Sequence, residues 1–173
     1  MMGALLREKR GIAAVEFAFA LPFLVLLYIG GYQLSDAISA YRKVTVATRT
    51  IADLTSQYTS VTNGDLDDIL AASQQVMTPY KMANAELVVS QVSIDGSGNA
   101  KVSWSRARNT TALTEGSAYT VASSIKQNNT SLIVATIKYN YVPVAASSLI
   151  GTIPMRDVII MSPRASSTVK KIS

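Results

Sequence analysis

Apolar and small residues run almost without interruption along the N-terminal part of the chain, over residues 12–33, and Glu16 is the one charged residue among them. Residues 12–32 would form a helix about 31 Å long, which matches the roughly 30 Å hydrocarbon core of a bilayer. The pattern therefore predicts a helix that can span a membrane.

The helical periodicity continues beyond this apolar run. Polar residues such as Asp36, Arg42 and Asp53 stand between mostly apolar positions that recur every three or four residues, namely Leu34, Ile38, Tyr41, Val44, Thr48, Ile51 and Leu54. A cleaved secretory signal would instead have an apolar region of about 7–15 residues followed by a break. We therefore expect one helix over residues 12–57, about 69 Å long, that ends in the polar stretch 56–64.

A second, amphipathic helix is predicted after that stretch, starting at Asp65 as its N-cap and ending before Pro79. Its apolar face comprises Leu66, Ile69, Leu70, Ser73, Val76 and Met77. The acids Asp65, Asp67 and Asp68 could in principle hold a divalent cation. Acids in the first turn also offset the helix dipole without a cation, and we favour this explanation.

The rest of the chain indicates strands. Residues 86–94 and 100–106 flank the turn sequence at 95–99 and predict a β-hairpin. Two further strands are expected at 133–141 and 158–161, a surface loop with a short helix at 107–130, and a polar, frayed tail at 165–173. The predicted fold class is α+β: a small antiparallel sheet packed on the long helix and on the amphipathic helix.

Composition excludes several functions. The chain of 173 residues contains no His and no Cys, which removes the common nucleophile arrangements and the best transition-metal ligands. The turn at 95–99 lacks the Lys-Ser/Thr pair of a phosphate-binding loop. The net charge of +5 is scattered rather than gathered in a stripe, which argues against nucleic acid as a partner. We expect no enzyme activity, no cofactor and no metal.

The charges around the apolar run suggest both an orientation and a need for a partner. Arg7, Lys9 and Arg10 precede it, so the positive-inside tendency places the N-terminus in the cytoplasm and the bulk of the chain outside. A carboxylate such as Glu16 costs a few kcal/mol in lipid unless it is neutralised. We expect Glu16 to find a positive partner in another subunit.

Gly11, followed after four residues by Glu16 and Phe17 and preceded by basic residues, resembles the processing motif of type IV pilins. The wider segment 10–22, together with residues 31–33 and 42–53, is similar to the TadE-type minor pilins, or pseudopilins, of the Flp/Tad pilus system. The likeness covers about the first 55 residues.

The resemblance implies that a prepilin peptidase cuts between Gly11 and Ile12, so that residues 1–11 are a leader and Glu16 becomes the fifth mature residue. Residues 12–57 would be the transmembrane and spine helix, 58–164 an extracytoplasmic head and 165–173 a polar tail. The new ammonium group at Ile12 would pair with Glu16 of a neighbouring subunit. Arg7, Lys9 and Arg10 would be the cytoplasmic basic leader, and Phe17 part of the processing and assembly motif.

The implied protein is a bacterial minor pilin that sits in the inner membrane as a single-pass protein and enters an extracellular pilus used for surface attachment. Its partners would be the prepilin peptidase, other Tad pilins and the inner-membrane assembly platform. The head is larger than a major Flp pilin needs, which favours a minor subunit. The alternative is a permanently anchored extracytoplasmic scaffold or binding protein that keeps its N-terminus.

Overall fold

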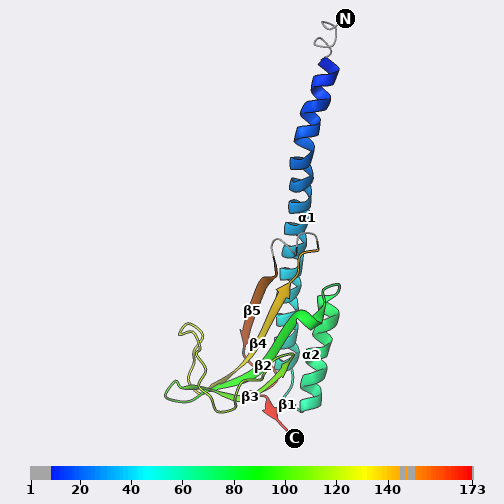
Figure 1. The fold of residues 1–173 in the computed structure, drawn as a ribbon. Helices are drawn as coiled ribbons and strands as arrows, with labels where there is room; N and C mark the ends of the chain where they lie inside the picture. The colour runs from blue at the N-terminus through cyan, green and yellow to red at the C-terminus, as the bar shows by residue number, and fades with distance from the viewer. Residues whose placement is uncertain (1–8, 145–146, 148–150, 173) are drawn as a thin grey trace, which may run out of the picture.

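The structure is a computed structural model that describes residues 9–144, 147 and 151–172. One long helix, α1 (Lys9–Ser56), runs through the molecule, with its N-terminal half projecting as a rod and its C-terminal half packed into a compact head (Figure 1). The helix continues through Pro22 without a break in its assignment. The expectation of one helix that continues past the apolar run is confirmed.

The second helix, α2 (Asn63–Met77), follows the two-residue strand β1 (Ser60–Val61). Its N-cap is Thr62 rather than Asp65, so that prediction is wrong. The backbone N–H of Asp65 donates to Thr62 Oγ1 at 3.1 Å, and the backbone N–H of Thr62 donates to Asp65 Oδ2 at 2.8 Å. This capping box satisfies two N–H groups at the start of the helix, and the hydrogen bonds from Thr62 lower the pKa of the Asp65 carboxyl.

A short 3₁₀ helix, η2 (Met82–Asn84), leads into a four-stranded antiparallel sheet of order β3-β2-β4-β5. Its strands are β2 (Ala85–Ile94), β3 (Ala100–Arg108), β4 (Thr130–Tyr141) and β5 (Ile153–Met161). The predicted hairpin and the third strand are confirmed. The fourth strand starts five residues earlier than expected and includes Pro154. An edge strand such as β5 tolerates proline because one side of its backbone has no neighbouring strand to bond.

The main core lies between one face of this sheet and the two helices, which stand side by side on it (Figure 1). Helix α1 contributes residues spaced by three and four positions, so that a single stripe of the helix is buried. The fully buried members include Val44, Ala47 and Ile51 from α1, Leu66, Leu70 and Met77 from α2, and Leu87, Val89, Ile133 and Ile137 from the sheet. The predicted α+β fold is thereby confirmed.

The opposite face of the sheet carries a smaller apolar cluster, which includes Val92, Leu132 and Val134 together with Val121. Residues 107–130, all of which the structure describes, contain no helix, so the short helix expected there is wrong. Part of the segment instead lies along the edge of β3: the backbone N–H of Val102 donates to Ser117 O at 2.9 Å, and that of Tyr119 donates to Ala100 O at 2.9 Å. These bonds occupy backbone groups that a helix would have needed for itself.

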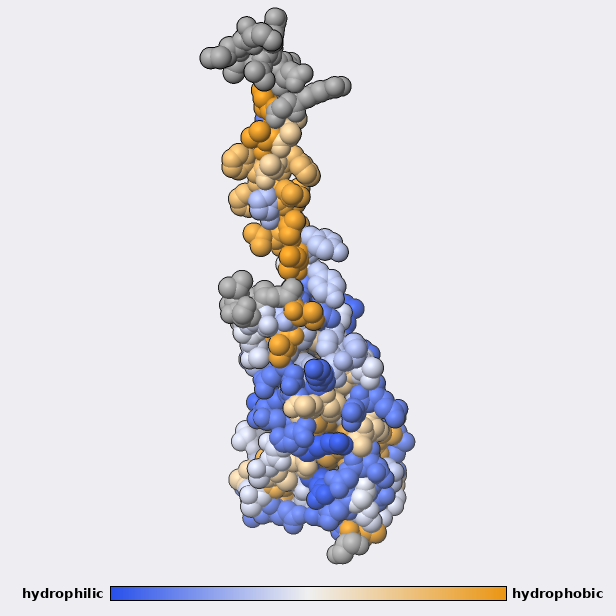
Figure 2. Space-filling view, turned by 45° about the vertical axis from the view of Figure 1, so that its right-hand side comes forward, coloured by the Kyte–Doolittle hydropathy of each residue, from blue (hydrophilic) through white to orange (hydrophobic). Residues whose placement is uncertain are grey.

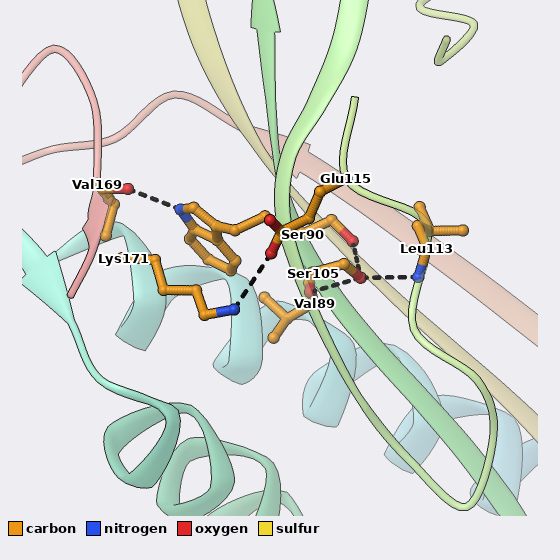
Figure 3. Close-up of polar contacts among 8 residues, drawn as sticks. Val89, Ser90, Ser105, Leu113, Glu115, Val169 and Lys171 are labelled. Atoms are coloured by element: carbon orange, nitrogen blue, oxygen red, sulfur yellow. Dashed lines mark hydrogen bonds and ion pairs between the residues drawn. The ribbon is translucent and has the colours of Figure 1, made fainter. Parts of the chain in front are cut away.

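The C-terminal tail is folded onto the head, so the prediction of a frayed tail is wrong. Strand β6 (Lys170–Lys171) pairs in parallel with β1, and Val169 is fully buried. The carbonyl of Val169 accepts a hydrogen bond from the indole Nε1 of Trp104 at 2.7 Å (Figure 3). The backbone N–H of Val169 donates to Gln91 Oε1 at 2.7 Å. The buried side chain of Val169 and its backbone hydrogen bonds with Trp104 and Gln91 therefore hold the tail on the head.

We expect removal of residues 169–173 to lower the free energy of unfolding by about 3 kcal/mol, since one buried valine and two buried hydrogen bonds are lost. Urea unfolding of the full chain in detergent, followed by the fluorescence of the single tryptophan, measures this. The matched control is Ile172→Ala, because the Ile172 side chain is exposed. An equal midpoint for the truncated and complete chains would show that the tail contributes nothing.

Candidate functional site

The N-terminal half of α1 is a bare apolar rod, which we define as residues 12–32. Its large side chains point into open space: Phe19 is 74% exposed, Phe23 73% and Leu27 75%. Figure 2 shows the change from this mostly orange rod to a mostly blue head. Within the described residues, one helix is long and apolar enough to cross a membrane, and it contains this rod. Exposed apolar surface on this scale is consistent with a single-pass anchor.

The residues of the predicted processing motif lie at the far tip of the rod. Gly11 and Ile12 belong to the first turns of α1, and Ile12, Glu16 and Phe17 all have exposed side chains. Residues 12 and 16 are four apart on one helix and therefore share a face. The predicted basic leader falls partly outside the described residues: Arg7 lies beyond them, whereas Lys9 and Arg10 start the helix.

A polar cluster that the sequence did not predict holds the junction between rod and head. The hydroxyl of Tyr80 donates to Asp36 Oδ1 at 2.8 Å, and the hydroxyl of Tyr141 donates to Asp36 Oδ2 at 2.5 Å. The ring of Tyr80 also packs edge-on against those of Tyr139 and Tyr141, with ring centroids 6.3 Å apart in each pair. This Asp36 cluster connects α1 to the segment after α2 and to the end of β4.

Burial and the neighbouring carboxylate both favour the neutral form of these tyrosines. Burial, with a further contribution from the hydrogen bond to Asp36, raises the pKa of Tyr80 to about 12. The same causes, in the same order, raise the pKa of Tyr141. Both phenols therefore remain hydrogen-bond donors at neutral pH, and each oxygen of the Asp36 carboxylate receives one of them.

No periodic pattern in the sequence could have linked these residues, because Tyr141 is 105 positions away from Asp36. The sequence held only a weak indication of this cluster. Asp36 is the first acid after the apolar run, and Tyr80 and Tyr141 each stand next to the end of a predicted element. Such positions mark ends of elements, but they do not say which ends meet.

The acids at the start of α2 are engaged within the protein. Asp67 forms a bidentate ion pair with Arg106 of β3, with oxygen–nitrogen distances of 2.8 and 2.6 Å, and the hydrogen bond from Arg106 lowers the pKa of the Asp67 carboxyl. Asp65 is occupied in the capping box. Among the residues that the structure describes, no group of three or more His, Cys, Asp or Glu side chains could hold a metal ion.

Residues 11–53 match the family model described as TadE-like protein. The chain carries a TadE-like segment. This segment begins at Gly11, contains the whole rod and Asp36, and ends three residues before the end of α1. The remainder of the head lies outside the match, and no curated protein and no solved structure matches the chain.

The TadE-like segment agrees with the resemblance inferred from the sequence. It contains Gly11, Ile12, Glu16 and Phe17, so the rod tip is part of the family's pattern. Its other end, Asp53, lies in the half of α1 that packs into the head. The TadE-like segment therefore consists of a membrane-compatible part and a core-forming part on one helix.

We expect Asp36→Asn to lower the free energy of unfolding by about 2 kcal/mol, because two charge-assisted hydrogen bonds become neutral ones. Asp68→Asn is the matched control, since Asp68 is exposed on α2 and its replacement should cost about 0.5 kcal/mol. Urea unfolding in detergent compares the two. A loss no greater for Asp36→Asn than for Asp68→Asn would contradict the role given to the cluster.

The raised phenol pKa values also predict a pH dependence. Because the pKa of Tyr80 is higher in the folded state than the ordinary value near 10, its contribution to stability is complete below pH 10 and is lost as the pH rises through about 12. Absorbance at the phenolate wavelength should show Tyr80 and Tyr141 ionising above the ordinary tyrosine pKa near 10. In Asp36→Asn their titration should shift toward lower pH.

Proposed function

We propose that this protein is a minor pilin, or pseudopilin, that contributes to assembly of a Flp/Tad pilus used for surface attachment. The observation that carries the proposal is the placement of Gly11, Ile12 and Glu16 at the exposed tip of a bare apolar rod, within the TadE-like segment. The proposed location is the bacterial inner membrane, with the N-terminus in the cytoplasm and the head outside. Partners would be other Tad pilins and the inner-membrane assembly platform.

In this proposal a prepilin peptidase cuts the bond between Gly11 and Ile12. That bond lies in the first turns of α1, so the helix must open locally to reach an active site. Opening is easiest at the end of a helix, where backbone groups lack helical partners, and glycine weakens a helix by about 1 kcal/mol relative to alanine. The basic residues Arg7, Lys9 and Arg10 would keep this end at the cytoplasmic face.

Cleavage would create the positive partner that Glu16 needs. The new ammonium group of Ile12 would lie at the very tip of the rod, one helical turn from the exposed carboxylate of Glu16. In a medium of low dielectric constant the attraction between such charges is much stronger than in water. Pairing between Glu16 of one subunit and the ammonium group of its neighbour would offset the cost of burial and set the axial register of the rods.

The head supports a minor rather than a major subunit. It has its own sheet, a second helix and two apolar clusters, and most of it lies outside the TadE-like segment. We assign it no catalytic role. The second candidate, a permanently anchored extracytoplasmic scaffold, would use the same rod without cleavage.

We expect the mature protein, isolated from its native membrane, to start at Ile12. Intact-mass spectrometry would then show the loss of residues 1–11. Gly11→Leu should leave the chain uncut, because a bulky side chain obstructs the approach of the scissile backbone to the peptidase, whereas Ala18→Leu should be cut normally. A native chain that retains Met1 favours the anchored scaffold instead.

We expect Glu16→Ala to be cleaved nearly as well as the unaltered chain but to fail to co-purify with partner pilins. The adjacent substitution Val15→Ala, which leaves the charges intact, should incorporate normally. Immunoblotting of sheared pili and of the membrane fraction measures both steps. Normal incorporation of Glu16→Ala would refute the charge-pairing account.

A further inference from the structure

The end of the head that faces the rod presents apolar side chains next to the C-terminal end of the membrane-compatible segment. Val142 and Val144 follow β4 directly and are 44% and 76% exposed. They line one groove together with Tyr32, the last residue of the rod, and with Asp36. We call Val142, Val144 and Tyr32 the collar.

The Asp36 cluster fixes the height of the collar along the rod. Tyr141 immediately precedes Val142, and its hydroxyl donates a hydrogen bond to Asp36. This bond holds the end of β4 at the level of Asp36. Asp36 lies four residues, or about 6 Å, beyond Tyr32 along the helix. The collar therefore stands where the rod ends and not farther down the head.

The headgroup layer of a bilayer would lie at the level of the collar. If residues 12–32 fill a hydrocarbon core of about 30 Å, the interfacial layer occupies roughly the next 5–7 Å on each side. We propose that the collar lies in the headgroup layer of the same membrane that the rod crosses, so that the head rests on the lipid surface instead of standing clear of it. This inference depends on the membrane anchoring in the proposed function and adds a lipid contact to the head.

The chemistry of the groove suits a phospholipid surface. Tyr32 has an amphipathic ring of the kind enriched at membrane interfaces. Lys81 is exposed and lines the same groove, where its ammonium group can meet lipid phosphates. The acid at this level, Asp36, has both carboxylate oxygens hydrogen-bonded to tyrosine hydroxyls of the head.

The opposite end of the head provides the contrast. Ile172 is also an exposed aliphatic residue, at 48%, but it follows Lys170 and Lys171 at the end of the head remote from the rod (Figure 1). It is far from any membrane that the rod could span. Exposure of one aliphatic side chain therefore does not distinguish the two positions, whereas continuity with the rod does.

Site-specific fluorescence tests the collar. The chain has no cysteine, so Val144→Cys, Ile172→Cys and Leu24→Cys each give a single labelling site and leave Trp104 intact. Each full-length variant is labelled with an environment-sensitive fluorophore and reconstituted, at low protein density, into phosphatidylcholine–phosphatidylglycerol vesicles. For each labelled position we compare how strongly a nitroxide-bearing lipid and an aqueous quencher reduce the emission of the fluorophore. Trp104 fluorescence confirms that each variant is folded.

We expect the nitroxide lipid to quench about half of the emission at position 144, because a side chain in the boundary layer lies within about 5–10 Å of the upper acyl chains. Position 24 should be quenched by the lipid and shielded from the aqueous quencher, and position 172 should respond only to the aqueous quencher. Removing phosphatidylglycerol should weaken quenching at 144 but not at 24.

The outcomes separate the collar from the anchor. If position 24 is quenched by the nitroxide lipid and position 144 behaves like 172, the rod is inserted and the collar inference is wrong. If 144 is shielded from both quenchers, a protein surface covers it and the lipid contact is likewise refuted. If position 24 is not quenched, the membrane anchoring itself fails and the collar inference falls with it.

Discussion

A single uninterrupted helix has to satisfy two different surroundings, and the rest of the structure follows from that constraint. Along residues 12–32 its side chains are mostly apolar, and nearly all of them are exposed in the part of the chain that the structure describes. Farther along, the helix buries a narrow stripe that includes Val44, Ala47 and Ile51 and exposes charged residues elsewhere. The sheet and α2 are arranged to cover that stripe, so the head is built around the helix rather than attached to its end.

This shared helix makes the junction mechanically important. A rod joined to a head by packing alone could tilt, since the apolar contacts of a core are not directional. The Asp36 cluster adds directional hydrogen bonds from two other parts of the chain, about one helical turn beyond the rod. Burial of the two tyrosines and their hydrogen bonds to Asp36 raise the phenol pKa values, so that both hydroxyls stay donors over the neutral pH range.

Local patterns were sufficient to predict most elements but not how distant ones meet. The continuous helix, α2 and the β2–β3 hairpin each follow from periodicity or turn residues within about 20 positions. The tail was misjudged because its polar sequence carries one apolar anchor, Val169, whose partners Gln91 and Trp104 are more than 60 positions away. Similarly, the first half of β5 lacks alternation and is recruited by its pairing with β4. The placement of the motif residues on the rod follows from the continuous helix, and their role in processing and assembly stays a prediction.

Two carboxylates, Glu16 and Asp36, lie near the two ends of the apolar segment, and their surroundings differ. Asp36 and Glu16 are 20 residues apart, about 30 Å along a helix, which is close to the thickness of a hydrocarbon core. Two tyrosine hydroxyls of the same chain donate hydrogen bonds to Asp36, so both oxygens of this carboxylate have partners within one subunit. Glu16 is left exposed at the tip. Since an unneutralised carboxylate is costly in lipid, the unsatisfied end is the one that gains most from a neighbouring subunit. In the proposed function, assembly would therefore be favoured through the rod tip, while the hydrogen bonds of Asp36 join the head to its own helix.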